Sequence, residues 1–326
     1  MSAQAEDRPP AGMKKIVVIG EILVEIMATT RGNGFAEPLP LIGPFPSGAP
    51  AIFIDQAGKF GQPCGIVSCV GDDDFGRVNL DRLSADGVDI SGVSIDPEVP
   101  TGSAFVRYRD DGARDFVFNI KYSACGRISL GPQAHALVES SDHLHVMGTS
   151  LFSESVVEAI LSAVGVIKAK GGTVSFDPNV RPEMLGLPGL RSAFDEIFSC
   201  CDLYLPSGAE LFLFTEVTDE EAAIAEILNR GVKAVVVKHG AEGAAYYDRS
   251  GAIRQHPFRV SEIDPTGAGD CFGAVFVSCW LRGMPAADAL RYAAAAGARA
   301  VERQGPMEGA STQAELDAFM AQQERS

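Results

Sequence analysis

Short apolar runs that end in glycine alternate with amphipathic stretches along most of this 326-residue chain. The run KIVVI at residues 15–19 is followed by Gly20, and GIVSCV at residues 65–70 is followed by Gly71. Between them, residues 51–60 carry apolar side chains at helical spacing. A short apolar run bounded by glycine is typical of a parallel strand that is buried on both faces. Strands that alternate with helices predict an α/β fold with a mainly parallel sheet and helices on both faces.

The alternation continues toward the C-terminus. Further strands are expected at residues 143–147, 173–176, 202–205 and 234–238, and helices at 75–85, 154–168 and 220–229. After residue 270 the pattern becomes entirely helical. Thr312 and Glu315 form a capping box, which predicts the start of the last helix.

One stretch interrupts this alternation. Residues 101–120 read TGSAFVRYRDDGARDFVFNI, in which two β-rich segments flank Asp111-Gly112, a strong hairpin signal. A hairpin inserted in an α/β chain is usually an edge appendage or a lid, and residues 39–42 are expected to add a strand to it. We therefore predict one domain at residues 14–322, with lid segments at about 38–45 and 92–121. The polar residues 1–13 are expected to form a disordered tail.

Charge and cysteine content exclude several classes of partner. The net charge of −16 repels nucleic acid and anionic lipid surfaces. The chain has no run of 18 apolar residues, so no membrane span is expected, and the N-terminus does not resemble a secretory signal. The seven cysteines are odd in number and include no C-x-x-C pair, which favours free, buried thiols in a reducing cytoplasm.

The sequence DPTGAGD at residues 264–270, followed at once by an apolar helix, carries the strongest chemical signal. The amides of Gly267, Ala268 and Gly269 are expected to point outward at the start of that helix. A helix N-terminus bears partial positive charge, so these amides form a site for an anion. Asp270 would repel an anion, but it fits as a base that accepts the proton of an attacking hydroxyl while the amides stabilise a transferred phosphoryl group.

Two other interpretations of this loop remain open from the residues alone. Asp270 could be a helix-capping residue, as Asp often is. Gly267-x-Gly269-x-x-x-Gly273 also matches a dinucleotide-binding turn, but such a site needs a following strand that ends in an acidic residue, and only helices follow. Elsewhere, His143 and His145 alternate on one expected strand; without a third ligand nearby we interpret them as ordinary strand residues rather than a metal pair.

The DPTGAGD loop resembles the C-terminal signature of the PfkB, or ribokinase-like, carbohydrate kinases. Seven further landmarks follow the family's order between residue 14 and about 310: Gly20-Glu21, Gly48-Ala49-Pro50-Ala51, Val70–Gly76 (VGDDDFG), Pro100-Thr101-Gly102, Asp177-Pro178-Asn179-x-Arg181, Glu210 and Lys238-x-Gly240-x-x-Gly243. The resemblance implies a Rossmann-like, ribokinase-like α/β domain with a small β-sheet lid over a sugar. It also makes Asp270 the catalytic base.

The resemblance implies MgATP as the phosphoryl donor, with adenine between the helices after residue 285 and residues 238–245. The residues that it assigns to the nucleotide are Ser207, Glu210, Lys238, Gly240, Gly243, Thr266, Gly267 and Gly269. Glu210 would act on Mg²⁺ through water, and Asp264 is a candidate ligand for K⁺, as in some members of the family. Alternatively, Gly240 and Gly243 serve only to form a turn. Ser207 stands where the family has Asn.

For the sugar, the resemblance assigns Glu25, Gly48, Ala49, Arg107, Asn179, Arg181 and Asp270. Ile52 stands where the family often has Asn, so one hydroxyl contact is replaced by an apolar wall. Alternatively, Glu25 is a solvated side chain on a strand and does not contact the sugar. Arg107 and Arg109 alternate on the expected lid strand, where they either meet an acceptor or form the solvated face of an edge strand.

The strings GEILVEIMATT and GPFPSGAPAIFIDQ resemble the bacterial tagatose kinases most, so the expected reaction is phosphorylation of D-tagatose at O6. A 2-keto-3-deoxygluconate kinase and a fructokinase are the alternatives within the family. A nucleotide-dependent oxidoreductase and a non-catalytic sugar sensor are alternatives of other classes, and the intact Asp270 argues against the sensor. The exposed apolar edge of the hairpin predicts a homodimer joined through the lid.

Overall fold

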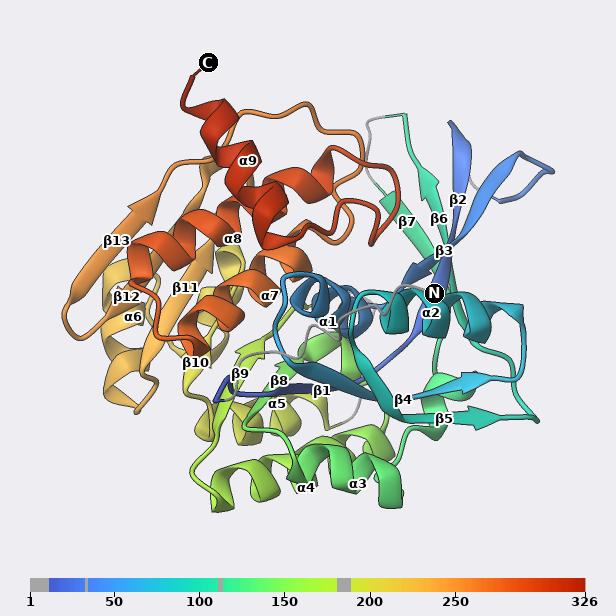
Figure 1. The fold of residues 1–326 in the computed structure, drawn as a ribbon, viewed down its shortest axis with the longest axis horizontal. Coiled ribbons are helices and arrows are strands. Elements are labelled where there is room, and N and C mark those ends of the chain that lie inside the picture. Colours follow the sequence, from blue (N-terminus) through green and yellow to red (C-terminus); the bar gives the residue numbers. More distant parts are fainter. Residues whose placement is uncertain (1–11, 33–34, 111–113, 181–188, 326) are drawn as a thin grey trace, which may run out of the picture.

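The computed structural model describes residues 12–32, 35–110, 114–180 and 189–325. Its large sheet consists of β1 (Ile16–Ile19), β4 (Cys64–Gly71), β5 (Asp89–Asp96), β8 (His143–Met147), β9 (Thr173–Asp177), β10 (Leu203–Tyr204), β11 (Ala234–Lys238), β12 (Ala244–Asp248) and β13 (Gly251–Gln255). The strand order is β13-β12-β11-β10-β9-β8-β1-β4-β5 (Figure 1). Pairing is parallel from β5 to β11, and β12 and β13 are antiparallel. The predicted α/β sheet is therefore confirmed.

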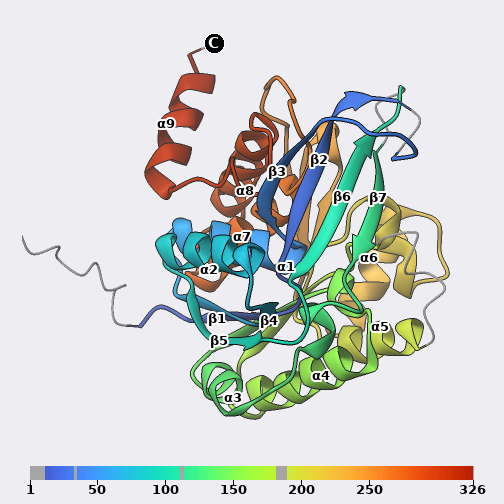
Figure 2. The same ribbon diagram turned by 90° about the vertical axis from the view of Figure 1, so that its right-hand side faces the viewer.

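Helices cover both faces of this sheet (Figures 1 and 2). One face packs against α1 (Ala49–Lys59), α2 (Asp74–Ala85), α7 (Ala268–Leu281) and α8 (Ala286–Val301); the other packs against α3 (Pro132–Glu139), α4 (Glu154–Ala169), α5 (Leu190–Ser199) and α6 (Glu220–Asn229). Alternate residues of β1 enter the two cores: Ile16 and Val18 enter the first, and Val17 and Ile19 enter the second. The apolar runs in the sequence reflect this burial on both sides.

The C-terminal region is helical, as predicted. The last helix, α9 (Gln313–Gln323), begins at the expected capping box, in which the Thr312 hydroxyl accepts from the Glu315 amide. Between α8 and α9 the structure adds an irregular segment at residues 302–312, which the helical pattern did not predict. Its central residues are buried, which is unusual for a loop.

A small second sheet stands over one end of the large one (Figure 2). It contains β2 (Leu23–Arg31), β3 (Leu41–Ser47), β6 (Gly102–Tyr108) and β7 (Arg114–Asn119) in the order β3-β2-β6-β7. The predicted hairpin is confirmed, because β6 and β7 pair antiparallel from Ser103 and Asn119 to Tyr108 and Arg114. Its expected turn at Asp111-Gly112 lies outside the described residues, as do residues 1–11 of the expected tail.

The predicted boundaries of this sheet need correction. Strand β2 belongs to it although no strand was expected there, and β3 extends beyond the expected residues 39–42. Residues 92–96 belong instead to β5, the edge strand of the large sheet beside β4. As an edge strand β5 is only partly buried and carries many polar residues, so its sequence lacks the apolar run that marks the central strands.

His143 and His145 are core residues, as interpreted from the sequence. The two ring nitrogens of His143 each lie 2.7 Å from a hydroxyl oxygen, one of Thr173 and the other of Ser175 on β9. His145 stacks on Phe53 with ring centroids 3.8 Å apart. Within the described ranges, no group of three or more His, Cys, Asp or Glu residues could hold a metal. All seven cysteines are free thiols, and none of the described helices is long and apolar enough to cross a membrane.

Candidate active site

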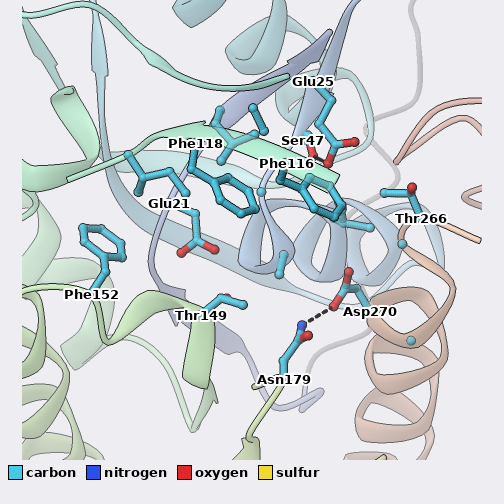
Figure 3. Close-up of a pocket in the computed structure, with 18 of the residues that line it drawn as sticks. Glu21, Glu25, Ser47, Phe116, Phe118, Thr149, Phe152, Asn179, Thr266 and Asp270 are labelled. Atoms are coloured by element: carbon cyan, nitrogen blue, oxygen red, sulfur yellow. Dashed lines mark hydrogen bonds between the residues drawn. The ribbon is translucent and has the colours of Figure 1, made fainter. Parts of the chain in front are cut away.

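A cavity of about 450 Å³ lies between the small sheet, the carboxyl ends of the central strands and the N-terminal end of α7 (Figure 3). Ligands of open α/β sheets commonly bind at that end of the strands. The predicted site residues that line it are Glu25, Gly48, Ala49, Asn179, Ser207, Lys238, Thr266, Gly267, Gly269 and Asp270. The fold thus brings together residues separated by up to 245 positions.

Gly267 is the N-cap of α7 and has a left-handed conformation, with φ of 79°. A Cβ added there would lie 2.4 Å from the carbonyl oxygen of Pro306, so the position requires glycine. Ala268 and Gly269 are the first two residues of the helix, and first-turn amides have no partner within the helix itself. The Ala268 amide donates a long hydrogen bond of 3.4 Å to the Pro265 carbonyl. The helix dipole adds partial positive charge at this turn, which favours an anion there.

Asp270 lies in the first turn of α7 and is 6% exposed. The Asn179 amide donates a hydrogen bond of 3.2 Å to Asp270 Oδ1 (Figure 3). Because Gly267 holds the N-cap position, Asp270 is not the capping residue, which removes that alternative. Its carboxylate lines the cavity beside the helix-terminal amides, where a base for an incoming hydroxyl is needed.

Asp264 is fully buried and holds the loop in shape. Its Oδ1 accepts from the Thr266 amide at 3.0 Å and from the Thr266 hydroxyl at 2.6 Å, and its Oδ2 accepts from the Gly305 amide at 3.1 Å. Both oxygens therefore serve the local conformation in this structure. A monovalent cation at Asp264 stays a proposal.

Lys238 is the last residue of β11, and its side chain extends toward the anion site. Its ammonium pairs with Asp177 Oδ2, and its Nζ lies 3.9 Å from where a Cβ of Gly269 would stand. Asp177 is 1% exposed, and its other oxygen has no hydrogen-bond partner among the described residues. A buried polar atom of this kind usually has a partner, so it suggests room for a further polar ligand. Asp177 begins the Asp177-Pro178-Asn179-x-Arg181 landmark, but the sequence did not predict a role for it.

Glu210 is not a solvated surface charge. Its two carboxylate oxygens accept from the amides of Val180 and Ser207, each at 2.7 Å. Burial raises the pKa of Glu210, and the Asp177 carboxylate raises it further, whereas the Lys238 ammonium opposes both effects. The side chain therefore lies in one electrostatic cluster with Asp177 and Lys238, although it does not itself line the described cavity.

Two buried carboxylates line the cavity under the small sheet. Glu25 and Ser47 lie together at this side of the cavity (Figure 3), where Glu25 accepts from the Ser47 hydroxyl at 2.7 Å. Glu21 accepts from the Ser150 hydroxyl at 2.8 Å. The role of Glu21 was missed from the sequence, where it was only a landmark of the family order. Glu25 lies on strand β2 and is buried, so the solvated alternative does not apply. Phe116, Phe118, Phe152 and Ile52 supply apolar walls.

Arg114 is a functional candidate that the sequence analysis missed. From β7 its Nη1 donates to the Thr266 hydroxyl at 2.6 Å and lies 3.9 Å from Asp264 Oδ1. It lines the cavity together with Phe116 and Phe118, which share its side of the strand. The alternation of Arg114, Phe116 and Phe118 in the sequence was the available signal, but the pattern alone does not say which set faces the site.

Arg107 does not occupy the predicted position. It alternates with Ala104, which lines the cavity, and Val106, so it projects from the opposite face of the small sheet. There it pairs with Asp115 at 2.5 Å, and Arg109 pairs with the same carboxylate. We therefore correct its assignment as a sugar contact. Arg181 lies outside the described residues.

Gly240 and Gly243 lie beyond the cavity lining. A Cβ on Gly243 would come 2.2 Å from the Gln255 carbonyl oxygen, so packing against the β12–β13 hairpin explains this glycine. Gly240 has φ of 57° and faces open space. The plain-turn alternative thus accounts for Gly243, and Gly240 stays a candidate for nucleotide contact.

Comparisons with known proteins relate the whole chain to one family. Residues 13–313 match the model of the pfkB family carbohydrate kinases. The chain is 31% identical to a 2-dehydro-3-deoxygluconokinase of Thermoproteus tenax, over 96% of each chain. A ribokinase II candidate from E. coli in complex with ATP and Mg²⁺ has a TM-score of 0.90 and 49% identity, covering 95% of this chain and all of that one. A fructokinase of Vibrio cholerae O395 with fructose, ADP and potassium has a TM-score of 0.80 and 26% identity, covering 94% of this chain and 98% of that one.

Proposed function

Because the chain belongs to the PfkB family of carbohydrate kinases and is an ATP-dependent sugar kinase, we propose that it phosphorylates a ketohexose at a primary hydroxyl, with D-tagatose at O6 as the preferred substrate. The observation that carries the choice of a neutral sugar is the pair of buried carboxylates, Glu21 and Glu25, in the cavity that Asp270 shares. Carboxylates accept hydrogen bonds from sugar hydroxyls and repel an acidic substrate.

In the proposed reaction Asp270 accepts the proton of the attacking hydroxyl. Asn179, which donates to Asp270 Oδ1, orients the carboxylate. The amides of Gly267, Ala268 and Gly269 stabilise the negative charge of the group in transfer, and the Lys238 ammonium adds a positive charge next to Gly269. Together these groups supply the base and the anion site that phosphoryl transfer requires.

The residues present fit a magnesium nucleotide. The helix-terminal amides and Lys238 suit phosphate oxygens, and the unpartnered oxygen of Asp177 beside Glu210 suits a hydrated divalent cation. When bound, ATP would supply the phosphoryl group, and Mg²⁺ would offset part of its negative charge. Asp264 and the loop around it are proposed to hold a monovalent cation such as K⁺.

A keto sugar acid is the second candidate. Arg114 and Lys121 line the cavity and could pair with a carboxylate, and one relative is a 2-dehydro-3-deoxygluconokinase. Against it, Arg114 already donates to Thr266, and Arg107, a cation proposed from the sequence, faces away from the cavity. The neutral sugar therefore has the stronger support.

The test is kcat/KM for D-tagatose, D-fructose and 2-keto-3-deoxygluconate, measured side by side with MgATP. We expect D-tagatose to have the highest value. A preference of tenfold or more for the keto acid would overturn the proposal. In that case Lys121→Met should lower kcat/KM for the acid selectively, because the substitution removes a cation and keeps an unbranched side chain.

A further inference from the structure

The buried segment of residues 305–307, between α8 and α9, packs against the loop that forms the anion site. The Gly305 amide donates to Asp264 Oδ2 at 3.1 Å. The Pro306 carbonyl lies so close to Gly267 that a Cβ there would be 2.4 Å away. The segment therefore contacts the DPTGAGD loop at Asp264 and at the N-cap of α7. Any shift of residues 305–307 would move the amides that face the cavity.

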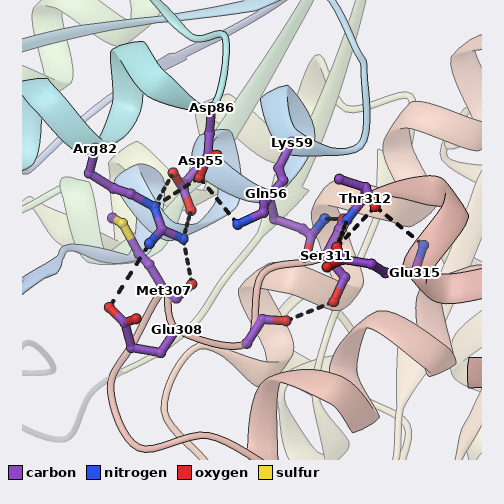
Figure 4. A network of polar contacts seen from close by, with 11 residues as sticks. Asp55, Gln56, Lys59, Arg82, Asp86, Met307, Glu308, Ser311, Thr312 and Glu315 are labelled. Carbon is purple, nitrogen blue, oxygen red and sulfur yellow. Dashed lines mark hydrogen bonds and ion pairs between the residues drawn. The ribbon is translucent and has the colours of Figure 1, made fainter.

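Arg82 of α2 holds the other side of this segment (Figure 4). Its Nη2 donates to the Met307 carbonyl at 2.7 Å. The same guanidinium makes two bonds to Asp55 of α1, at 3.2 and 3.1 Å, and an ion pair of 2.8 Å with Asp86. Arg82 thus connects α1, α2 and the supporting segment.

The arrangement is rigid because each group in it is buried or paired. Asp55 and Met307 are 0% exposed, so loss of the guanidinium would leave a buried carboxylate and a buried carbonyl without that donor. Unpaired buried charges are strongly unfavourable. Gln56 fixes the end of the same loop by a reciprocal pair with Ser311, at 2.7 and 2.9 Å. The loop is thus held at Ser311 and at residues 305–307.

We propose that Arg82, fixed by Asp55, is a positioning residue for catalysis: through the Met307 carbonyl it sets residues 305–307 and thereby the amides at the start of α7. Arg82 does not line the cavity, so its effect on substrate binding is small. Its effect is on the transition state, because displaced amides no longer face the charge that develops there. Misplacement of catalytic groups by about 1 Å can cost about 10²-fold in rate.

The first test is steady-state kinetics of Arg82→Gln, Arg82→Lys and Asp55→Asn, with the sugar that the wild type phosphorylates best among D-tagatose, D-fructose and 2-keto-3-deoxygluconate. We expect kcat to fall about tenfold or more in Arg82→Gln, with both KM values within threefold of wild type. Arg82→Lys should recover part of kcat, because it retains a charge and one donor. Arg77→Gln is the matched control, since Arg77 lies on the same helix and forms its ion pairs with Asp74 and Asp72 at the surface.

The second test needs no turnover and so does not depend on the sugar or the kinase proposal. Hydrogen–deuterium exchange at the backbone amides of residues 264–271 should be faster in Arg82→Gln than in wild type and unchanged in Arg77→Gln. The inference is overturned if exchange there is unchanged, or if kcat stays within twofold of wild type in the folded variant. A rise in sugar KM at constant kcat would also overturn it, because Arg82 would then shape the binding pocket only.

Discussion

Asp270 combines burial, a fixed partner and a position beside the helix-terminal amides. We predict that Asp270→Asn lowers kcat about 10²–10⁴-fold, because the amide cannot accept the hydroxyl proton. Nucleotide affinity should be retained, since the substitution also removes a negative charge near the phosphates. The measurements are kcat by a coupled assay and MgATP affinity by calorimetry.

A matched control is Asp74→Asn, because Asp74 is also an acidic residue in the first turn of a helix but lies on the surface. It should leave kcat unchanged. If Asp270→Asn retained turnover within threefold of wild type, Asp270 would not be the base.

At the scale of elements, the small sheet is joined to the catalytic loop by the bond from Arg114 to Thr266. We predict that Arg114→Gln raises the sugar KM about tenfold, because a hydrogen bond from a charged group contributes about 1.5–3 kcal/mol to holding the sheet over the cavity. Arg109→Gln, which alters the outer face of the same hairpin, should change KM little. Equal KM values in wild type and Arg114→Gln would show that this bond does not control closure.

Two buried histidines of the large sheet should make the stability of the fold depend on pH. Burial lowers the pKa of His143 from 6.5 to about 3 and lowers that of His145 well below its usual range. The unfolded state therefore takes up protons first as the pH falls below 6.5, so stability is present above that pH and lost toward pH 3. For His143 this should lower the free energy of unfolding by about 2 kcal/mol between pH 7 and pH 5.

Urea unfolding at pH 7, 6 and 5 measures this loss. His143→Gln should have a shallower dependence of unfolding free energy on pH than wild type, whatever its absolute stability. His135→Gln, at an exposed position, should keep the wild-type slope. Parallel slopes in all three proteins would contradict neutral burial of His143.

At the scale of the whole molecule, apolar exposure gathers on one part of the surface. Of the large apolar side chains exposed in the described residues, Leu41, Ile42 and Val117 lie on the small sheet and do not line the cavity. An exposed sheet with apolar side chains tends to associate unless it is covered. We therefore predict a homodimer through the small sheets, seen by light scattering as twice the monomer mass at micromolar concentration.

Val117→Asp should shift this dimer toward monomer. Ile95→Asp is the control, because Ile95 is 58% exposed and Val117 is 57% exposed, but Ile95 lies on the edge of the large sheet. A wild-type monomer at micromolar concentration, or equal behaviour of the two variants, would contradict association through the small sheet.

The sequence by itself determined the central strands, the hairpin and the DPTGAGD loop. These features are local: an apolar run between glycines, a turn dipeptide, and glycines at the start of an apolar helix each have their physical reason within a few residues. The loop residues alone suggested an anion site beside Asp270 but left a capping role open, and the family resemblance made Asp270 the proposed base. The edge strand β5 was missed because partial burial leaves no apolar run to detect, and β2 was missed because Glu25 interrupts its apolar residues.

Only the tertiary structure decided which side chains meet. The strand pattern places Arg107 and Arg114 on a hairpin, but the pairing of Arg107 with Asp115 and of Tyr108 with Arg114 determines which of them faces the cavity. The connection from Asp55 through Arg82 to Met307 joins residues more than 200 positions apart. Such contacts depend on how sheets and helices pack, because a side chain's partner is set by distance in space, and the local sequence carries no record of it.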